Sequence, residues 1–278
     1  MFSLWILAHG LFGLIIGSFL NVVALRSFTG RSLQGRSGCL SCGGTLTPLM
    51  LVPVLSWVAM RRQCVHCGSR ISLQYPLVEI VTALGFATVA GMALVPFAHV
   101  CALVLVAFWI LISTYDIRHT IVPDGWAYAA CIAAFGIAFA ATQPNEWVYL
   151  VVGAAVPAIP LLLLWVATSG KAMGFGDVKL ALSMGALLGP LYGTAAVFLA
   201  FVIGALVSVF ILMPWPHFAR LYTYLVSPRL RRYRVGFTMN SEVPFGPFLI
   251  SGAFIVWLQL TYHLHLPLID LFLFPFVR

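Results

Sequence analysis

The sequence predicts an all-α membrane protein, a polytopic bundle of about eight transmembrane helices with a small cytoplasmic zinc-knuckle loop domain. Its 278 residues are 62% hydrophobic and only 8% charged, whereas soluble domains carry about 25% charged residues. The apolar residues form repeated runs near the ~20 residues that a helix needs to cross a bilayer. So few charged residues could not cover a water-facing surface, which excludes a soluble fold.

The apolar runs locate the individual spans. They lie at roughly 2–25, 77–95, 97–115, 125–142, 147–168, 178–190, 192–213 and 246–263. The first run lacks the cationic start and the cleavage site of a removable signal peptide, so we expect it to remain as a helix. The chain therefore divides into a first transmembrane helix (1–25), a cytoplasmic tetracysteine domain (26–76) and a membrane bundle (77–278) that includes a basic cytoplasmic loop (214–245).

The positions of the cations predict the orientation. An outside amino terminus sends the polar stretches 26–76, 116–124, 169–177 and 214–245 to the cytoplasm, and every Lys and Arg except Arg278 lies in or beside these stretches. This distribution follows the positive-inside rule. It also explains the net charge of +8, so we expect no nucleic-acid partner. The basic loop mixes aromatic side chains with cations, which suits contact with anionic membrane lipid.

Four cysteines form two CxxC pairs and predict a metal site. Cys39 and Cys42 form the first pair, and Cys64 and Cys67 form the second. Two such pairs separated by about 20 residues are typical of a zinc ribbon or knuckle. The alternative is two disulfides or four free thiols, and a reducing cytoplasm disfavours the disulfides. Four protein ligands leave no open coordination position, so the zinc ion would be structural.

Asp and Glu together number only seven, so each can be weighed. Four of them lie at or inside the end of an apolar span, namely Glu79, Asp116, Asp124 and Asp177. An ionised carboxylate in such a place costs a few kcal/mol unless it is paired or hydrated. Their positions therefore indicate functional carboxylates and not ordinary solvent-exposed ones.

Asp116 and Asp177 are the predicted catalytic pair. Asp177 follows two glycines, Gly174 and Gly176, which let backbone or substrate approach its carboxylate closely. The alternative is charge pairing of the two carboxylates with the nearby cations Arg118 and Lys179, which leaves the glycines unexplained. Two neighbouring carboxylates can share one proton, so that one takes a proton from water while the other polarises a peptide carbonyl. Amide hydrolysis then needs neither a metal ion nor a nucleophilic side chain.

Asp124 is better explained by structure than by catalysis. It lies in the segment Val122-Pro-Asp124-Gly, which is typical of a turn. Asp is also a favoured N-cap residue of a helix. A catalytic role for Asp124 stays the alternative.

Six pieces of sequence, spread over nearly the whole chain, form a specific set. They are Gly17-Ser-Phe-Leu-Asn21-Val-Val, the two CxxC pairs, Ile71-Ser-Leu-Gln-Tyr75-Pro-Leu-Val-Glu79, Asp116 with Val122-Pro-Asp124, Gly174-Phe-Gly-Asp177-Val-Lys-Leu, and Val243-Pro-Phe-Gly-Pro-Phe. In this order they resemble the type IV prepilin peptidases, which are bifunctional leader peptidases and N-methyltransferases.

The resemblance implies an activity and a substrate. Asp116 and Asp177 would be the aspartyl dyad of a Gly-x-Gly-Asp intramembrane protease, on a loop supported by Gly174, Gly176 and Lys179. The substrate would be a type IV prepilin, or a pseudopilin of type II secretion, whose short basic leader is cut on the cytoplasmic side of the bacterial inner membrane. The new amino terminus would then be methylated from S-adenosylmethionine.

The resemblance also suggests a methyl-donor or substrate site, because Asn21, Arg26, Tyr75 and Glu79 match family positions. Asn21 could equally form a helix–helix hydrogen bond, and Glu79 could pair with an arginine.

Two other functions compete with the peptidase. A transporter would use the carboxylates to relay protons or metal ions, but no inverted repeat relates the two halves of the sequence. A zinc-dependent scaffold without catalysis would leave the glycines before Asp177 unexplained. The sequence therefore favours an aspartic endopeptidase that is also a methyltransferase.

Overall fold

The computed structural model describes residues 2–28, 32–142, 147–212 and 244–264. Most of the predicted basic loop 214–245 and of the tail after residue 263 lies outside the described residues. The all-α prediction is confirmed, since the described residues form helices joined by turns and loops, with only two isolated β-bridges. The main helices are α1 (Phe2–Arg26), α3 (Gln74–Ala90), α4 (Pro96–His119), α5 (Asp124–Ala141), α6 (Trp147–Ala167), α7 (Phe175–Val207) and α9 (Gly246–Tyr262).

Fewer of the described helices are long and apolar enough to cross a membrane than the predicted count of about eight. Five of the described helices are long and apolar enough to cross a membrane: α1, α4, α5, α6 and α7 with the π-helical turn that follows it. Helices α3 and α9 are apolar but have only 17 residues each. The predicted spans 178–190 and 192–213 belong to the single element α7, which is sharply bent between them.

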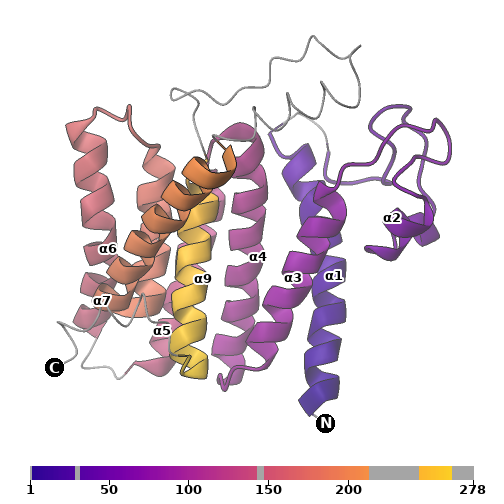
Figure 1. Ribbon diagram of the computed structural model, residues 1–278. Coiled ribbons are helices and arrows are strands. Elements are labelled where there is room, and N and C mark those ends of the chain that lie inside the picture. Colours follow the sequence, from indigo (N-terminus) through magenta and orange to yellow (C-terminus); the bar gives the residue numbers. More distant parts are fainter. Residues whose placement is uncertain (1, 29–31, 143–146, 213–243, 265–278) are drawn as a thin grey trace.

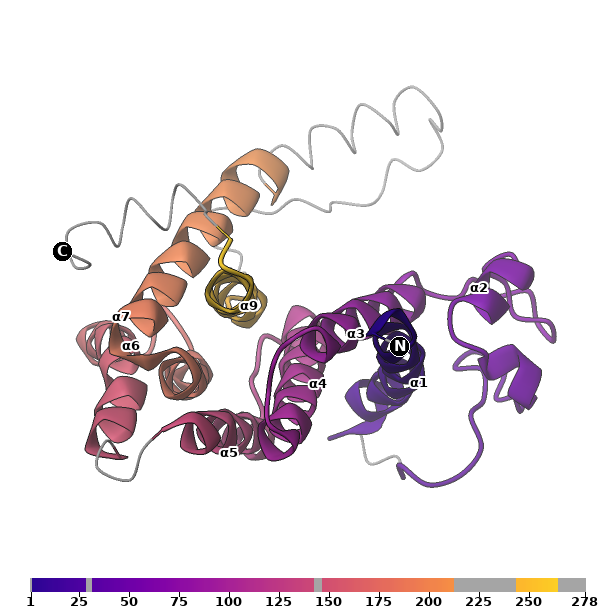
Figure 2. The same cartoon turned by 90° about the horizontal axis from the view of Figure 1, so that it is seen from below.

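Helix α7 bends at Gly189, whose φ of 75° and ψ of −178° lie outside the helical region. Pro190 follows, and it ends the preceding helix because it has no backbone N–H and its ring clashes with the preceding turn. Gly185 and Gly193 would lie about 12 Å apart along a straight helix. A Cβ atom added to Gly193 would instead lie 3.1 Å from the Cα atom of Gly185. The two arms of α7 therefore fold toward each other, and Figures 1 and 2 show the second arm, in orange, crossing the bundle at a slant.

Close helix packing holds the bundle together. Helix α1 lies along α3, where Cβ atoms added to Gly13 and Gly17 would come within 2.8 Å of α3 backbone atoms. Helix α9 approaches the second arm of α7 in the same way at Gly252. Small residues allow such contacts between membrane helices. The largest fully buried side chains include Trp109, Leu105 and Ile112, all on α4.

The direction of each helix gathers the polar connections at one end of the bundle. Helices α1, α4 and α6 end there, and α3, α5, α7 and α9 begin there, which is the upper end in Figure 1. The loop domain (residues 32–73) includes the short helices η1 (Pro48–Leu51) and α2 (Leu55–Ala59) and lies beside α1 and α3. We call this end of the bundle the polar end.

Candidate active site

Two buried carboxylates share one cavity at the polar end. Asp116 lies in the last turns of α4, and Asp177 lies in the first turn of α7. Their exposed fractions are only 4% and 7%. Both line a cavity of about 710 Å³, whose walls come from the α4–α5 and α6–α7 connections, the second arm of α7 and the start of α9. The fold thus places both carboxylates of the predicted pair, one from α4 and one from α7, in the wall of the same cavity.

The start of α9 positions the Asp116 carboxylate. The backbone N–H of Gly246, the first residue of α9, donates a hydrogen bond of 3.0 Å to Asp116 Oδ2. This N–H belongs to the helix turn that has no partner inside the helix, and a helix amino terminus favours a negative charge. A Cβ atom at residue 246 would lie 2.7 Å from Asp116 Oδ2. A side chain larger than glycine therefore cannot be placed here without moving the carboxylate.

Sequence reasoning did not assign a role to Gly246. The segment that contains it, Val243-Pro-Phe-Gly-Pro-Phe, was noticed only as one of the six pieces of the resemblance. Its position just before an apolar span was the available signal.

The two glycines before Asp177 have different surroundings. A Cβ atom on Gly176 would lie 2.6 Å from the Cβ atom of Val122, so this glycine lets α7 start close against the α4–α5 connection. Gly174 is the N-cap residue of α7 with an ordinary φ of −73°. The nearest atom to a Cβ placed on Gly174 is the Gly176 nitrogen, at 3.9 Å. The packing thus requires glycine at position 176 and not at position 174.

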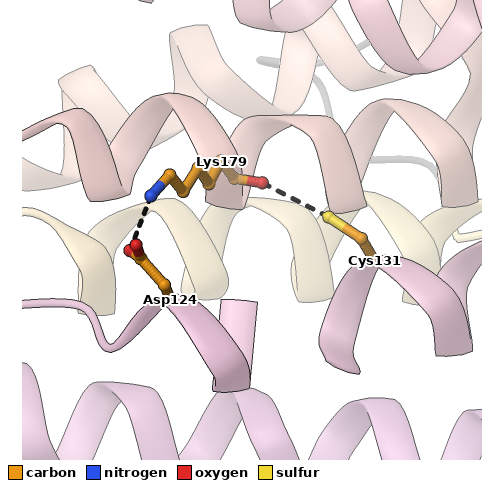
Figure 3. A network of polar contacts seen from close by, with 3 residues as sticks. All are labelled: Asp124, Cys131 and Lys179. Carbon is orange, nitrogen blue, oxygen red and sulfur yellow. Dashed lines mark hydrogen bonds and ion pairs between the residues drawn. The ribbon is translucent and has the colours of Figure 1, made fainter. Parts of the chain in front are cut away.

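Lys179 does not line the cavity and joins α7 to α5 (Figure 3). Its Nζ atom lies 2.6 Å from Asp124 Oδ1, and its backbone carbonyl accepts a hydrogen bond of 3.5 Å from the Cys131 thiol. The Nζ atom also lies over the rings of Tyr128 and Phe175, at 5.5 and 5.1 Å from their centroids. These contacts fix the first arm of α7 against α5.

The N-cap interpretation of Asp124 is wrong. Pro123 is the N-cap residue of α5, no side-chain cap hydrogen bond is present, and Asp124 is the first helical residue. Pro123 still has an extended ψ of 130° and Asp124 is already helical, so the helix begins one residue earlier than an Asp124 cap requires. Asp124 has an exposed side chain (66%) that pairs with Lys179 and does not line the cavity.

The cations near the dyad also have other partners. Lys179 pairs with Asp124, and the Arg118 Nε–H donates a hydrogen bond of 2.5 Å to Gln74 Oε1. Among the described residues, neither cation lies within 4.0 Å of Asp116 or Asp177. The alternative that these carboxylates exist for local charge pairing is therefore wrong.

The four residues suggested for the methyl donor do not share one cavity with the dyad. The Asn21 amide donates to the carbonyls of Gly17 and Tyr75, both at 3.2 Å, so it joins α1 to α3. Glu79 Oε2 accepts a hydrogen bond of 2.7 Å from the backbone N–H of Val54 in the loop domain. Arg26 donates to three loop carbonyls of residues 32, 34 and 36. The Asn21 amide and one carboxylate oxygen of Glu79 are thus already engaged by other parts of the chain.

The four cysteines of the loop domain form one cluster. Their sulfur atoms all lie within 4.8 Å of one another, and the Sγ atoms of Cys39 and Cys67 are 3.9 Å apart. Tetrahedral zinc with Zn–S bonds of ~2.3 Å separates its sulfur ligands by about 3.8 Å. Hydrogen bonds from the backbone of Cys42 and Ser41 lower the pKa of the Cys39 thiol to about 5, which favours its thiolate. A backbone hydrogen bond from Gly44 lowers the pKa of the Cys42 thiol, but its contacts with Cys67 and Cys39 outweigh this effect and raise the pKa to about 11. The cluster fits a closed metal site.

Turns of the same form present both cysteine pairs. The N–H of Gly43 donates to the carbonyl of Cys39, and the N–H of Gly68 donates to the carbonyl of Cys64. Both glycines have positive φ, 71° and 68°, a region that favours glycine. The two CxxC pairs therefore form the single cluster that their spacing predicted.

Comparison with known proteins gives the family. Residues 11–93 match the bacterial peptidase A24 N-terminal domain, and residues 103–209 match the type IV leader peptidase family. A prepilin leader peptidase/N-methyltransferase of Bacillus subtilis (strain 168) is 30% identical over 257 residues, which cover 89% of this chain and 92% of that protein. The chain belongs to the type IV leader peptidase family.

Other relatives support the same family assignment. A type 4 prepilin-like proteins leader peptide-processing enzyme of Escherichia coli O78:H11 is 32% identical over 203 residues, covering 64% of this chain and 75% of that protein. A prepilin leader peptidase/N-methyltransferase of Aeromonas hydrophila is 28% identical over 296 residues, covering 91% and 93% of the two chains. No solved structure matches the chain significantly. The N-terminal match contains the cysteine cluster, the second match contains both dyad carboxylates, and Gly246 lies beyond both.

Proposed function

We propose that this protein is a prepilin leader peptidase in which Asp116 and Asp177 activate water for peptide hydrolysis. One observation carries the proposal: two carboxylates from helices distant in the sequence are buried in the wall of one cavity. A chain with only seven Asp and Glu residues has no other reason to bury two of them together.

The chemistry follows from the arrangement. One carboxylate takes a proton from water, and the water oxygen attacks the scissile carbonyl while the protonated partner hydrogen-bonds the carbonyl oxygen. The protonated partner then donates its proton to the leaving amine. The N–H of Gly246 holds one oxygen of Asp116, so the second oxygen is left to face water or substrate. The burial of both groups limits competing water.

The substrate class follows from the position of the cavity and from the family. The cavity lies at the end of the bundle that carries the polar connections. With the amino terminus outside and this end in the cytoplasm of a bacterial inner membrane, a prepilin or pseudopilin can present its basic leader without moving it across the bilayer. The proposed units are the first helix (1–25), the cytoplasmic tetracysteine domain (26–76) and the membrane bundle with its basic loop (77–278).

The tetracysteine domain would hold one structural zinc ion. The separation of the sulfur atoms and the closed set of four thiolates support this proposal. Bound zinc would supply folding energy to a small domain that has little core of its own.

Methylation of the new amino terminus from S-adenosylmethionine is the proposed second activity, and the printed names of the relatives support it. Asn21 and Glu79 fit a methyl-donor site poorly, because their polar atoms are hydrogen-bonded to other parts of the chain. They fit a role in joining α1, α3 and the loop domain. The transporter alternative has no support from the relatives.

The test is co-expression with a type IV prepilin, followed by mass measurement of the prepilin amino terminus. Asp116→Asn and Asp177→Asn should each abolish leader removal at unchanged protein level and zinc content. Asp124→Asn is the matched control, because Asp124 lies outside the cavity, and it should keep most of the activity. Full cleavage by either dyad variant would refute the assignment. Methylation is read in the same spectrum as an added mass of about 14 Da on the cleaved product.

A further inference from the structure

Two histidines meet at the end of the bundle opposite the polar end. His9 lies on α1, and His99 lies in the first turn of α4, about 25 Å along that helix from Asp116. Their Nε2 atoms are 3.1 Å apart. The rings meet edge to face, with centroids 5.1 Å apart. Neither residue takes part in the proposed peptide hydrolysis.

The backbone fixes which nitrogen of His9 carries the proton. His9 Nδ1 lies 2.9 Å from the carbonyl oxygen of Trp5. A carbonyl can only accept, so His9 carries its proton on Nδ1 and directs the lone pair of Nε2 toward His99. Metal-binding histidines are commonly oriented by such a bond from the other ring nitrogen to a backbone carbonyl. The Trp5 ring, with its centroid 4.2 Å from that of His9, limits ring rotation.

The distance between the two nitrogens suits a shared ion. Imidazole nitrogens bind zinc at ~2.0–2.1 Å, so two ligands of one ion lie about 2.9 Å apart at a right angle and about 3.4 Å apart in a tetrahedron. The observed 3.1 Å lies between these values. Imidazole ligands suit Cu(II), Zn(II) and Ni(II), and Cu(II) binds most strongly in the usual order.

We propose that His9 and His99 form a second metal site, which binds one first-row transition ion, with Cu(II) preferred, and leaves the remaining coordination positions to water. The ion joins α1 to α4 at the end opposite the dyad. The competing explanation is a direct hydrogen bond between two neutral rings, which needs a proton on His99 Nε2.

Copper titration of the purified protein distinguishes the two explanations. Protein with zinc in its cysteine cluster is titrated with Cu(II) and followed by electron paramagnetic resonance, with zinc content measured in parallel by elemental analysis. The expected result is one Cu(II) per chain with nitrogen ligands and no loss of zinc. His9→Gln and His99→Gln should each weaken binding at least about tenfold, since loss of a mere supporting group around a metal already costs that much.

His263→Gln is the matched control, because His263 is exposed at the C-cap of α9 at the same end of the bundle. It should leave copper binding unchanged. Equal copper binding by unsubstituted protein and the His9→Gln, His99→Gln double variant would overturn the proposal. The pulsed electron paramagnetic resonance spectrum of the copper-loaded, unsubstituted protein is an independent test that needs no variant. Modulation from the remote nitrogens of imidazole is expected, and its absence would also overturn the proposal.

Discussion

The tetracysteine domain and the dyad place their functional side chains by different means. In the loop domain, two turns of the same form each present a pair of cysteines, and Gly43 and Gly68 supply the required backbone angles. In the bundle, Asp116 and Asp177 are brought together by three helices, and the hydrogen bond from Gly246 to Asp116 spans 130 residues. The first site depends on local turns, whereas the second depends on how closely helices pack.

This difference predicts which substitutions each region tolerates. Next to the dyad, Gly176 and Gly246 act by lacking a Cβ atom where two segments meet. In the loop domain, the corresponding glycines have no atom within 4 Å of an added Cβ and act only through positive φ. Methyl groups added at Gly176 and Gly246 should therefore disturb catalysis, and ligand loss in the loop domain should disturb folding.

The largest effect is expected for Gly246→Ala. The added Cβ atom would lie 2.7 Å from Asp116 Oδ2, so the carboxylate or α9 must shift. A displacement of about 1 Å in a catalytic group can reduce the rate about 10²-fold. Cleavage of a synthetic leader-plus-helix substrate in detergent measures the loss. Gly125→Ala is the control, since no atom lies within 4 Å of its added Cβ. Normal cleavage by Gly246→Ala would show that the start of α9 does not determine the catalytic position of the Asp116 carboxylate.

A smaller effect is expected for Gly176→Ala. Its methyl group would meet Val122, which can yield more easily than the carboxylate itself, so we expect a loss of about tenfold in the cleavage rate. Gly174→Ala should cleave almost normally, because position 174 has open space and an ordinary φ. Equal losses in the two variants would show that the loop acts through flexibility and not through packing.

Removal of metal ligands should act mainly on stability. A Cys39→Ser, Cys64→Ser variant should lose its zinc and unfold at a lower temperature, because metal binding contributes to the folding of such domains. Cleavage by the molecules that remain folded should change little. Elemental analysis and thermal unfolding, followed alongside the cleavage assay, measure the three quantities. Stoichiometric disulfides in the native protein would contradict the metal site.

The smallest effect is expected for the ion pair between Lys179 and Asp124. The Asp124 side chain is 66% exposed, so solvent screens the interaction. Such pairs contribute about 0.2–1 kcal/mol to stability. Lys179→Met and Asp124→Asn should therefore lower the melting temperature slightly and leave cleavage largely intact. A complete loss of cleavage in folded Asp124→Asn would instead give Asp124 a chemical role.

Local patterns were the part of the molecule that the sequence predicted best. Composition and apolar runs predicted an all-α membrane bundle, and the two CxxC pairs predicted the cysteine cluster. Fewer described helices than predicted are long enough to cross a membrane, because α3 and α9 have only 17 residues each and the predicted spans 178–190 and 192–213 are the two arms of α7 on either side of Gly189. Most of the basic loop 214–245 lies outside the described residues, so its contact with membrane lipid stays a prediction.

Contacts between distant residues were harder to predict. The shared cavity of Asp116 and Asp177 followed from helix direction and from the family resemblance. The contact between Gly246 and Asp116 could not be predicted, because no spacing rule connects residues so far apart. The ion pair of Asp124 could not be predicted for a related reason: its partner, Lys179, lies on another helix, and a local turn pattern does not indicate such a contact.

The bend in α7 decides which end of the bundle each later segment reaches. Its first arm starts beside Asp177 and leads away from the polar end, and the second arm returns toward that end (Figure 1). A straight helix of its 33 residues would extend about 50 Å and finish at the wrong end. Because the bend adds one reversal, α9 begins where α4 finishes. Gly189 and Pro190 thus reverse the direction of the chain once more, and this reversal brings the Gly246 N–H within reach of Asp116.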